Sequence, residues 1–209
     1  MVDGPAPAPW RGIDELAALV GAYCWLEQRI FAITGAWATR HPSGVEGAGA
    51  DADALGGSGL PELRVWCAAT SQRHAALAAR WAERLPVRAG VDRDALIAAP
   101  AGPLAAGLDE LASETDLCRG VTALVQGLLP GLDAIYGAHR RTASPVREGS
   151  VLEVLAGAHR EVAAEIRGGR SLIEGFGAAH PGPDGHANFA EFFERLLNGT
   201  RVFPAVRTS

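Results

Sequence analysis

Residues 13–40 have the sequence IDELAALVGAYCWLEQRIFAITGAWATR. Apolar side chains recur in it at intervals of three and four positions, the spacing that lines one face of an α-helix. His41 and Pro42 follow directly, and proline disfavours helical backbone at the residue before it. The sequence therefore predicts one helix from Ile13 to Arg40, roughly 42 Å long at the rise of an α-helix.

Three further apolar stripes of comparable length follow. Pro61 suits the first turn of a helix, and the stripe after it ends before Pro86. The stripe over residues 104–139 contains Pro130, which should bend or break a helix because proline lacks an amide hydrogen. The last stripe covers residues 147–176, and no strand-like alternation of useful length occurs. These patterns predict an all-α chain, folded as an antiparallel four-helix bundle around one core.

The domain organisation follows from the segments between and outside the stripes. We expect one bundle over residues 13–176, interrupted at 43–59 by a linker rich in glycine, alanine and aspartate. Residues 1–12 are expected to form a disordered arm. Residues 177–209 are expected to form a tail with a short amphipathic helix at 189–197.

The composition excludes several classes of function. All 19 basic residues are arginines, so the chain has neither a Schiff-base lysine nor a P-loop lysine. The net charge of -5 does not favour a nucleic-acid surface. Wholly apolar runs are shorter than a membrane span, and the three cysteines form no CxxC pair. We therefore expect a cytoplasmic protein with reduced cysteines and with neither nucleic-acid nor membrane partners.

Three polar residues stand near mid-helix where the stripes call for apolar ones: Glu27, His74 and His159. A buried lone carboxylate is strongly disfavoured unless it is paired, protonated or bound to a cation. In an aligned bundle the three side chains would converge at similar depth, and we interpret them as a candidate catalytic centre. The alternative is that each histidine is a core residue bonded to a carbonyl or carboxylate.

A second set of residues is expected to line a ligand site around this centre. Tryptophans concentrate in the first two helices and would suit a planar apolar ligand, although large aromatic side chains commonly just fill a core. The candidate ligand-binding residues are Tyr23, Trp25, Trp66, Ser71, Thr115 and Cys118.

Three basic residues, His139, Arg140 and Arg141, close the third stripe. Cations at a helix C-terminus interact favourably with the helix dipole. We therefore prefer a capping role for them over an anion site.

The two helical pairs joined by an extended connection resemble the ferritin-like superfamily. Its diiron members have a glutamate on the first and third helices and Glu-x-x-His on the second and fourth. Glu27 matches the first position, residues 71–74 the second motif and residues 156–159 the fourth. Ser71 and Ala156 replace the motif glutamates, and the third helix offers only Glu114 and Asp116.

This resemblance implies a ferritin-like bundle without a complete diiron site, hence no cofactor, with a single iron or zinc ion as the alternative. A DinB-like four-helix bundle is the alternative fold.

Three functions remain open. The first is a binding or accessory protein for a small apolar molecule or a protein partner, as a monomer or a homodimer. The second is an enzyme that uses Glu27, His74 and His159 as a mononuclear-metal oxidase or hydroxylase, or in acid–base catalysis. The third is an assembly module that uses the C-terminal segment.

Overall fold

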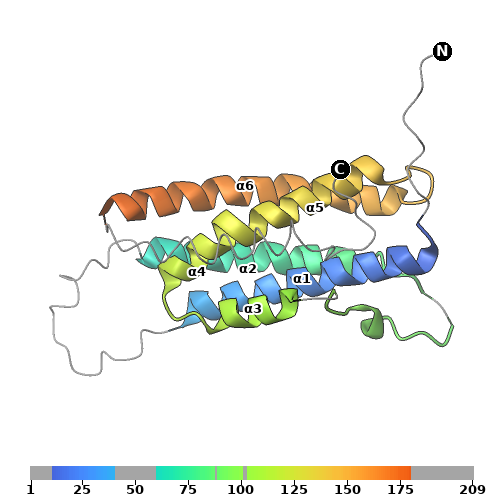
Figure 1. The fold of residues 1–209 in the computed structure, drawn as a ribbon, viewed down its shortest axis with the longest axis horizontal. Helices are drawn as coiled ribbons and strands as arrows, with labels where there is room; N and C mark the ends of the chain where they lie inside the picture. Colours follow the sequence, from blue (N-terminus) through green and yellow to red (C-terminus); the bar gives the residue numbers. More distant parts are fainter. Residues whose placement is uncertain (1–10, 41–59, 88, 101–102, 180–209) are drawn as a thin grey trace, which may run out of the picture.

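The computed structural model describes residues 11–40, 60–87, 89–100 and 103–179, and all regular secondary structure in these ranges is helical (Figure 1). This confirms the all-α prediction. The linker at 43–59, residues 1–10 of the arm predicted at 1–12, and the helix expected at 189–197 lie outside the described residues. The elements are α1 (Ile13–Thr39), α2 (Leu60–Ala82), the 3-10 turn η3 (Asp94–Leu96), α3 (Leu104–Ser113), α4 (Leu117–Ala123), the π-helical turn η4 (Leu124–Leu128), α5 (Leu129–Thr142) and α6 (Gly149–Ala179).

Along the long axis of the molecule, α1 and α6 run in one direction and α2, α4 and α5 run in the opposite one (Figure 1). α2 returns along α1, and the Ser71 hydroxyl donates to the Phe31 carbonyl at 3.0 Å. α6 returns along both α2 and α5: Arg84 bonds the Ser150 carbonyl at 3.1 Å, and Arg80 pairs with Glu161 at 2.8 Å. α3 lies beside α1 and runs in the same direction.

The prediction of one continuous helix over residues 104–139 is wrong, because the helix is interrupted between Ser113 and Leu117. α3 ends at Ser113, Glu114 has extended backbone, and the Asp116 side chain caps α4 by accepting the Arg119 amide at 3.1 Å. Aspartate is among the best N-cap residues because its carboxylate satisfies an amide that has no partner within the helix. Thr115 lies in this break and is exposed, so it is not on a buried stripe.

The helix irregularity predicted at Pro130 lies in the turn directly before this residue. Residues Leu124–Leu128 form a π-helical turn, and the Leu129 amide bonds the Leu124 carbonyl five residues back. Pro130 follows this turn directly, at the start of α5, and has no amide hydrogen to donate to the preceding turn. The chain therefore continues as a helix through Thr142 with one widened turn.

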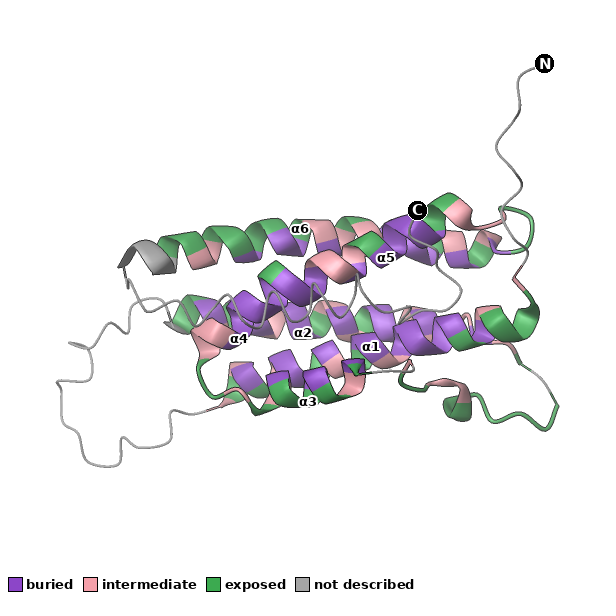
Figure 2. Cartoon of the chain, in the orientation of Figure 1, coloured by how far each residue is buried: buried purple, intermediate pink, exposed green. Residues whose placement is uncertain are grey.

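The buried face of each long helix points toward the shared interior, and the outer face of α6 is exposed (Figure 2). Close contact between α6 and the π turn depends on Gly169. A Cβ added there would lie 2.5 Å from a methyl group of Val125 and 3.0 Å from the Trp66 ring. The glycine pair at 168–169 therefore allows close packing and does not end the helix.

Two helical stretches, Ile13–Thr39 and Leu117–Thr142, are long and apolar enough to cross a membrane. The share of their apolar windows buried inside the molecule is 61% and 67%. Core helices of soluble proteins have this same combination of length, apolar composition and burial, so the two stretches are weak indicators of membrane insertion.

Candidate functional site in the helical core

The centre of the described core contains a hydrogen-bonded cluster formed by α1, α2 and α6. The His74 imidazole on α2 uses both ring nitrogens: Nδ1 contacts Glu27 Oε2 on α1, and Nε2 lies 3.0 Å from Glu165 Oε2 on α6. The exposed fractions of Glu27 and His74 are 0%, and that of Glu165 is 4%. The predicted contact between the mid-helix residues of α1 and α2 is present, and the third member of the cluster is Glu165.

The remaining carboxylate oxygens of this cluster are also hydrogen-bonded. The Tyr136 hydroxyl on α5 donates to Glu27 Oε1, and the Trp81 indole donates to the Tyr136 oxygen at 3.2 Å. Arg73 Nη2 donates to Glu165 Oε1 at 2.8 Å. Each side-chain polar atom of Glu27, His74 and Glu165 therefore has a partner, as buried polar groups require, whereas Arg73 Nε is buried without one.

Opposing effects set the pKa values in the cluster. Burial lowers the pKa of His74, but the Glu27 and Glu165 carboxylates outweigh burial and raise it to about 10. Burial raises the pKa of Glu165, but hydrogen bonds from His74 and its other neighbours lower it to about 2. The cluster at neutral pH is an imidazolium and a guanidinium, from His74 and Arg73, facing two carboxylates.

A second buried chain of hydrogen bonds starts at Tyr23 on α1. The Tyr23 hydroxyl lies 3.1 Å from His139 Nδ1, and His139 Nε2 lies 2.7 Å from Glu148 Oε2. Burial lowers the pKa of His139, and the pKa of Glu148 is also low: burial raises it, but bonds from His139 and the Ser144 amide outweigh burial. A neutral His139 therefore donates from Nε2 to the Glu148 carboxylate and accepts a hydrogen bond from the Tyr23 hydroxyl at Nδ1.

Aromatic rings separate the two hydrogen-bonded chains. Tyr23 and Tyr136 pack edge to face with centroids 5.0 Å apart, and Trp81 lies 5.0 Å from Tyr23 and 5.7 Å from Tyr136. Burial raises the pKa of both tyrosines above the ordinary value, so both phenols are neutral. The rings fill the space that a ligand would need between the two chains.

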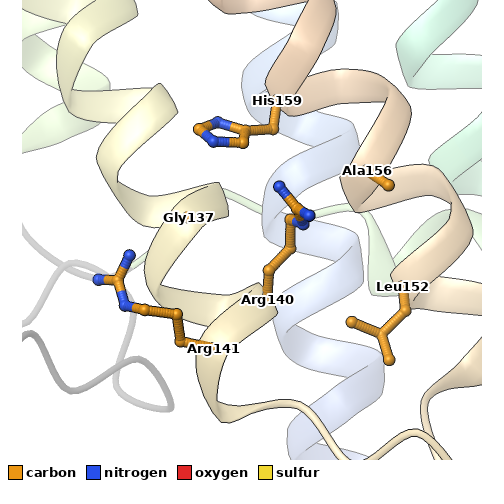
Figure 3. A pocket seen from close by; sticks show the side chains of 6 residues that line it. All are labelled: Gly137, Arg140, Arg141, Leu152, Ala156 and His159. Atoms are coloured by element: carbon orange, nitrogen blue, oxygen red, sulfur yellow. The ribbon is translucent and has the colours of Figure 1, made fainter.

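His159 does not join the central cluster, which corrects the expected convergence of Glu27, His74 and His159. Its Nδ1 lies 2.6 Å from Asp133 Oδ1 on α5, and 31% of its side chain is exposed. It lines an open cleft between α5 and α6 (Figure 3). The physical reason is helical phase: Ala158, and not its neighbour His159, occupies the buried face of α6.

The predicted ligand-binding residues do not form one site. Tyr23, Trp66 and Ser71 are buried, with Ser71 bonded to α1 backbone. Trp25 and Cys118 are half-buried against the core, and burial raises the pKa of the Cys118 thiol to about 11. Thr115 is exposed in the loop between α3 and α4.

The sequence interpretation missed Glu165 as a member of the centre and assigned His139 only a capping role. Both lie on continued stripes: Glu165 three residues after the buried Val162, and His139 three residues after Tyr136. This i, i+3 spacing was the signal that could have placed them in the core.

The central residues do not fit the metal site that the ferritin-like resemblance implies. The two carboxylates contact different nitrogens of His74, so they lie at opposite edges of one ring, and a single ion at either nitrogen would reach only one of them. The Arg73 guanidinium already forms an ion pair with the Glu165 carboxylate. Among the described residues, no group of three His, Cys, Asp or Glu side chains has an arrangement that could hold a metal ion.

Comparisons with family models, curated proteins and solved structures find no significant match to this chain.

Proposed function

We propose that this chain is a ferritin-like helical bundle in which a charge-balanced hydrogen-bonded cluster stands in place of a metal centre, and that it has a binding or accessory role. The observation that supports this most is the complete internal pairing of Glu27, His74 and Glu165, at 0%, 0% and 4% exposure. We expect the bundle to comprise α1, α2, α4 with α5, and α6.

Burial argues against catalysis at this cluster. A general acid or base must come within hydrogen-bond reach of its substrate. The partners of His74 are Glu27 and Glu165, and Tyr136 and Arg73 take the other carboxylate oxygens, so a substrate would have to displace an existing bond. Perturbed pKa values often mark active sites, but structural ion pairs perturb them as well. Here the paired charges account for the shifts.

The test is metal content. Protein purified without chelator, then incubated with excess Fe(II) or Zn(II) and desalted, should retain far less than one ion per chain by mass spectrometry. His74→Ala should retain the same amount as the unmodified chain. His159→Ala is the matched control, because it removes an imidazole outside the cluster.

One retained ion per chain in the unmodified protein, lost in His74→Ala but kept in His159→Ala, would overturn the proposal. That result would favour the mononuclear-metal enzyme.

A further inference from the structure

An open cleft of about 410 Å³ lies between the last turns of α5 and the first turns of α6 (Figure 3). Ligand sites commonly measure about 300–1,000 Å³, so this cleft suits a small molecule. It is separate from the buried Glu27–His74–Glu165 cluster. The residues that line it are Gly137, Arg140, Arg141, Leu152, Ala156 and His159.

The cleft combines two arginines with a histidine whose orientation is fixed. Arg140 extends toward Ala156 and His159, and Arg141 lies on the other side of Gly137 (Figure 3). The Asp133 carboxylate holds His159 through Nδ1 at 2.6 Å. Within the described ranges, no carboxylate forms an ion pair with Arg140 or Arg141, and the nearby Glu161 is already paired with Arg80.

Arg140 and Arg141 bring two guanidinium groups to the cleft, and Asp133, which holds His159, brings one carboxylate, so at least one guanidinium group is in excess. The C-terminal end of α5 contributes a partial negative charge of about half an elementary charge, which offsets only part of that excess. Arginine suits oxyanions because its planar fork of N–H donors matches phosphate and carboxylate oxygens. A phosphate monoester has three terminal oxygens against two in a carboxylate, so it can accept N–H groups from both arginines at once.

Gly137 keeps the floor of the cleft open. A Cβ added at this position would lie 3.4 Å from Arg141 Nη1 and 3.8 Å from His159 Cε1. Those are ordinary contact distances, so alanine fits, whereas a longer side chain would extend into the cleft. Leu152 and Ala156 supply an apolar wall on the α6 side.

We propose that this cleft binds a small phosphate monoester, with the phosphoryl oxygens at Arg140 and Arg141 and a short apolar group against Leu152 and Ala156. The inference rests on the proposed binding role and names its ligand class.

Phenyl phosphate, benzoate and inorganic phosphate are the probes, and titration calorimetry on the full chain is the measurement. Phenyl phosphate should bind most tightly of the three, because benzoate has one negative charge fewer and inorganic phosphate has no apolar group. Arg140→Gln and Arg141→Gln should each weaken phenyl phosphate binding at least about tenfold. Arg170→Gln removes an exposed arginine from the same helical pair outside the cleft, and it should change binding less than about twofold.

A steric pair of variants complements the charge variants. Gly137→Leu should abolish phenyl phosphate binding, while Gly137→Ala should retain the fold and most of the binding.

Three results would overturn the inference: no phenyl phosphate binding at millimolar concentration, benzoate binding as tightly as phenyl phosphate, or equal weakening by Arg170→Gln and Arg140→Gln. Failure here is distinguishable from failure of the proposed function. A metal ion retained through His74 would overturn the latter and leave phenyl phosphate binding unchanged.

Discussion

At the scale of single residues, His74 holds two carboxylates in the core by contacting both with one ring. The Glu27 and Glu165 side chains would repel each other in a medium of low dielectric constant if the ring between them were neutral. The raised pKa of His74, about 10, keeps the imidazolium between them. The protonated ring therefore links α2 to a carboxylate on α1 and to one on α6.

The first prediction is that the stability contributed by His74 depends on pH. Its pKa is about 10 in the folded chain against an ordinary 6.5, so this contribution is fully present below pH 6.5 and is lost as the pH rises toward 10. The difference in unfolding free energy between the unmodified chain and His74→Ala should therefore shrink from pH 6.5 to 8.5, as measured by urea titration. A constant difference over that range would contradict the assigned charge.

At acid pH, the contribution of Glu165 to folding stability changes in the opposite direction. The pKa of Glu165 is about 2 when folded against an ordinary 4.5, so its contribution is present above pH 4.5 and is lost as the pH falls toward 2. His139, with its lowered pKa, adds to the loss of stability below pH 6.5. Stability should thus decline on both sides of mildly acidic to neutral pH.

The second prediction concerns removal of the imidazole at neutral pH. His74→Ala leaves Glu27 and Glu165 facing each other in the core, and breaking a buried ion pair costs about 3–5 kcal/mol. His159→Ala removes a half-exposed partner of Asp133 and should cost less than about 1 kcal/mol. Urea unfolding of both variants measures the contrast. Similar losses in the two would show that the buried contacts around His74 are not the stabilising ones.

The pairing of Glu27 with His74 could be predicted because both residues interrupt strongly apolar stripes at matching depths. Glu165 had a weaker signal, its i, i+3 spacing from Val162, because the buried face of α6 also includes the small residues Ala158 and Gly169. The larger side chains Leu155 and Val162 are buried as the stripe predicts, but the core position between them belongs to Ala158, and the sequence interpretation gave it to His159.

At the scale of elements, α6 has two adjacent glycines with different surroundings. A Cβ at Gly169 would meet Val125 at 2.5 Å, whereas the nearest atom to a Cβ at Gly168 is Trp66 Nε1 at 3.9 Å. The distance at Gly169 is too short for real atoms, so the neighbouring elements would have to move apart.

The third prediction uses this pair. Gly168→Ala should stabilise the chain by up to about 1 kcal/mol, because alanine is the better helix former. Gly169→Ala gains the same propensity but overpacks the contact with η4, which typically costs about 1–3 kcal/mol, so its net effect should be destabilising. Thermal or urea unfolding of the two variants compares them directly. Stabilisation by both would mean that α6 is not in close contact with the π turn.

Helix boundaries show the same limits of sequence interpretation. α1 and α2 could be predicted closely because proline follows each helix and their apolar faces are large. The break between α3 and α4 was missed because residues 104–139 keep a helical period across it. The N-cap residue Asp116 was the local signal for a new helix.

At the scale of the whole molecule, Arg11 joins the beginning of α1 to the connection between α5 and α6. It pairs with Glu148 at 3.3 Å and bonds the Thr142 hydroxyl at 2.8 Å, and the side-chain exposures of Arg11 and Glu148 are 7% and 5%. The Glu148 carboxylate also accepts a hydrogen bond from His139 Nε2, so residues far apart in the sequence meet at one buried carboxylate.

The fourth prediction is that Arg11→Gln destabilises the chain by about 3–5 kcal/mol, as expected when one partner of a buried ion pair is removed. The control is Arg29→Gln, whose partner Asp109 is 72% exposed, and it should cost less than about 1 kcal/mol. Equal and small losses from both substitutions in urea unfolding would show that the end of the helical assembly does not depend on Arg11.

The π turn at Leu124–Leu128 also determines which residues reach the centre. The extra residue in this turn changes the position of every later side chain around the helix axis by roughly a quarter of a revolution, relative to an uninterrupted α-helix. Tyr136 and His139 face α1 only because of this rotation. If Leu124–Leu128 formed an ordinary α-turn with the same number of residues, both side chains would rotate away from Glu27 and Tyr23, although none of the four residues had been changed.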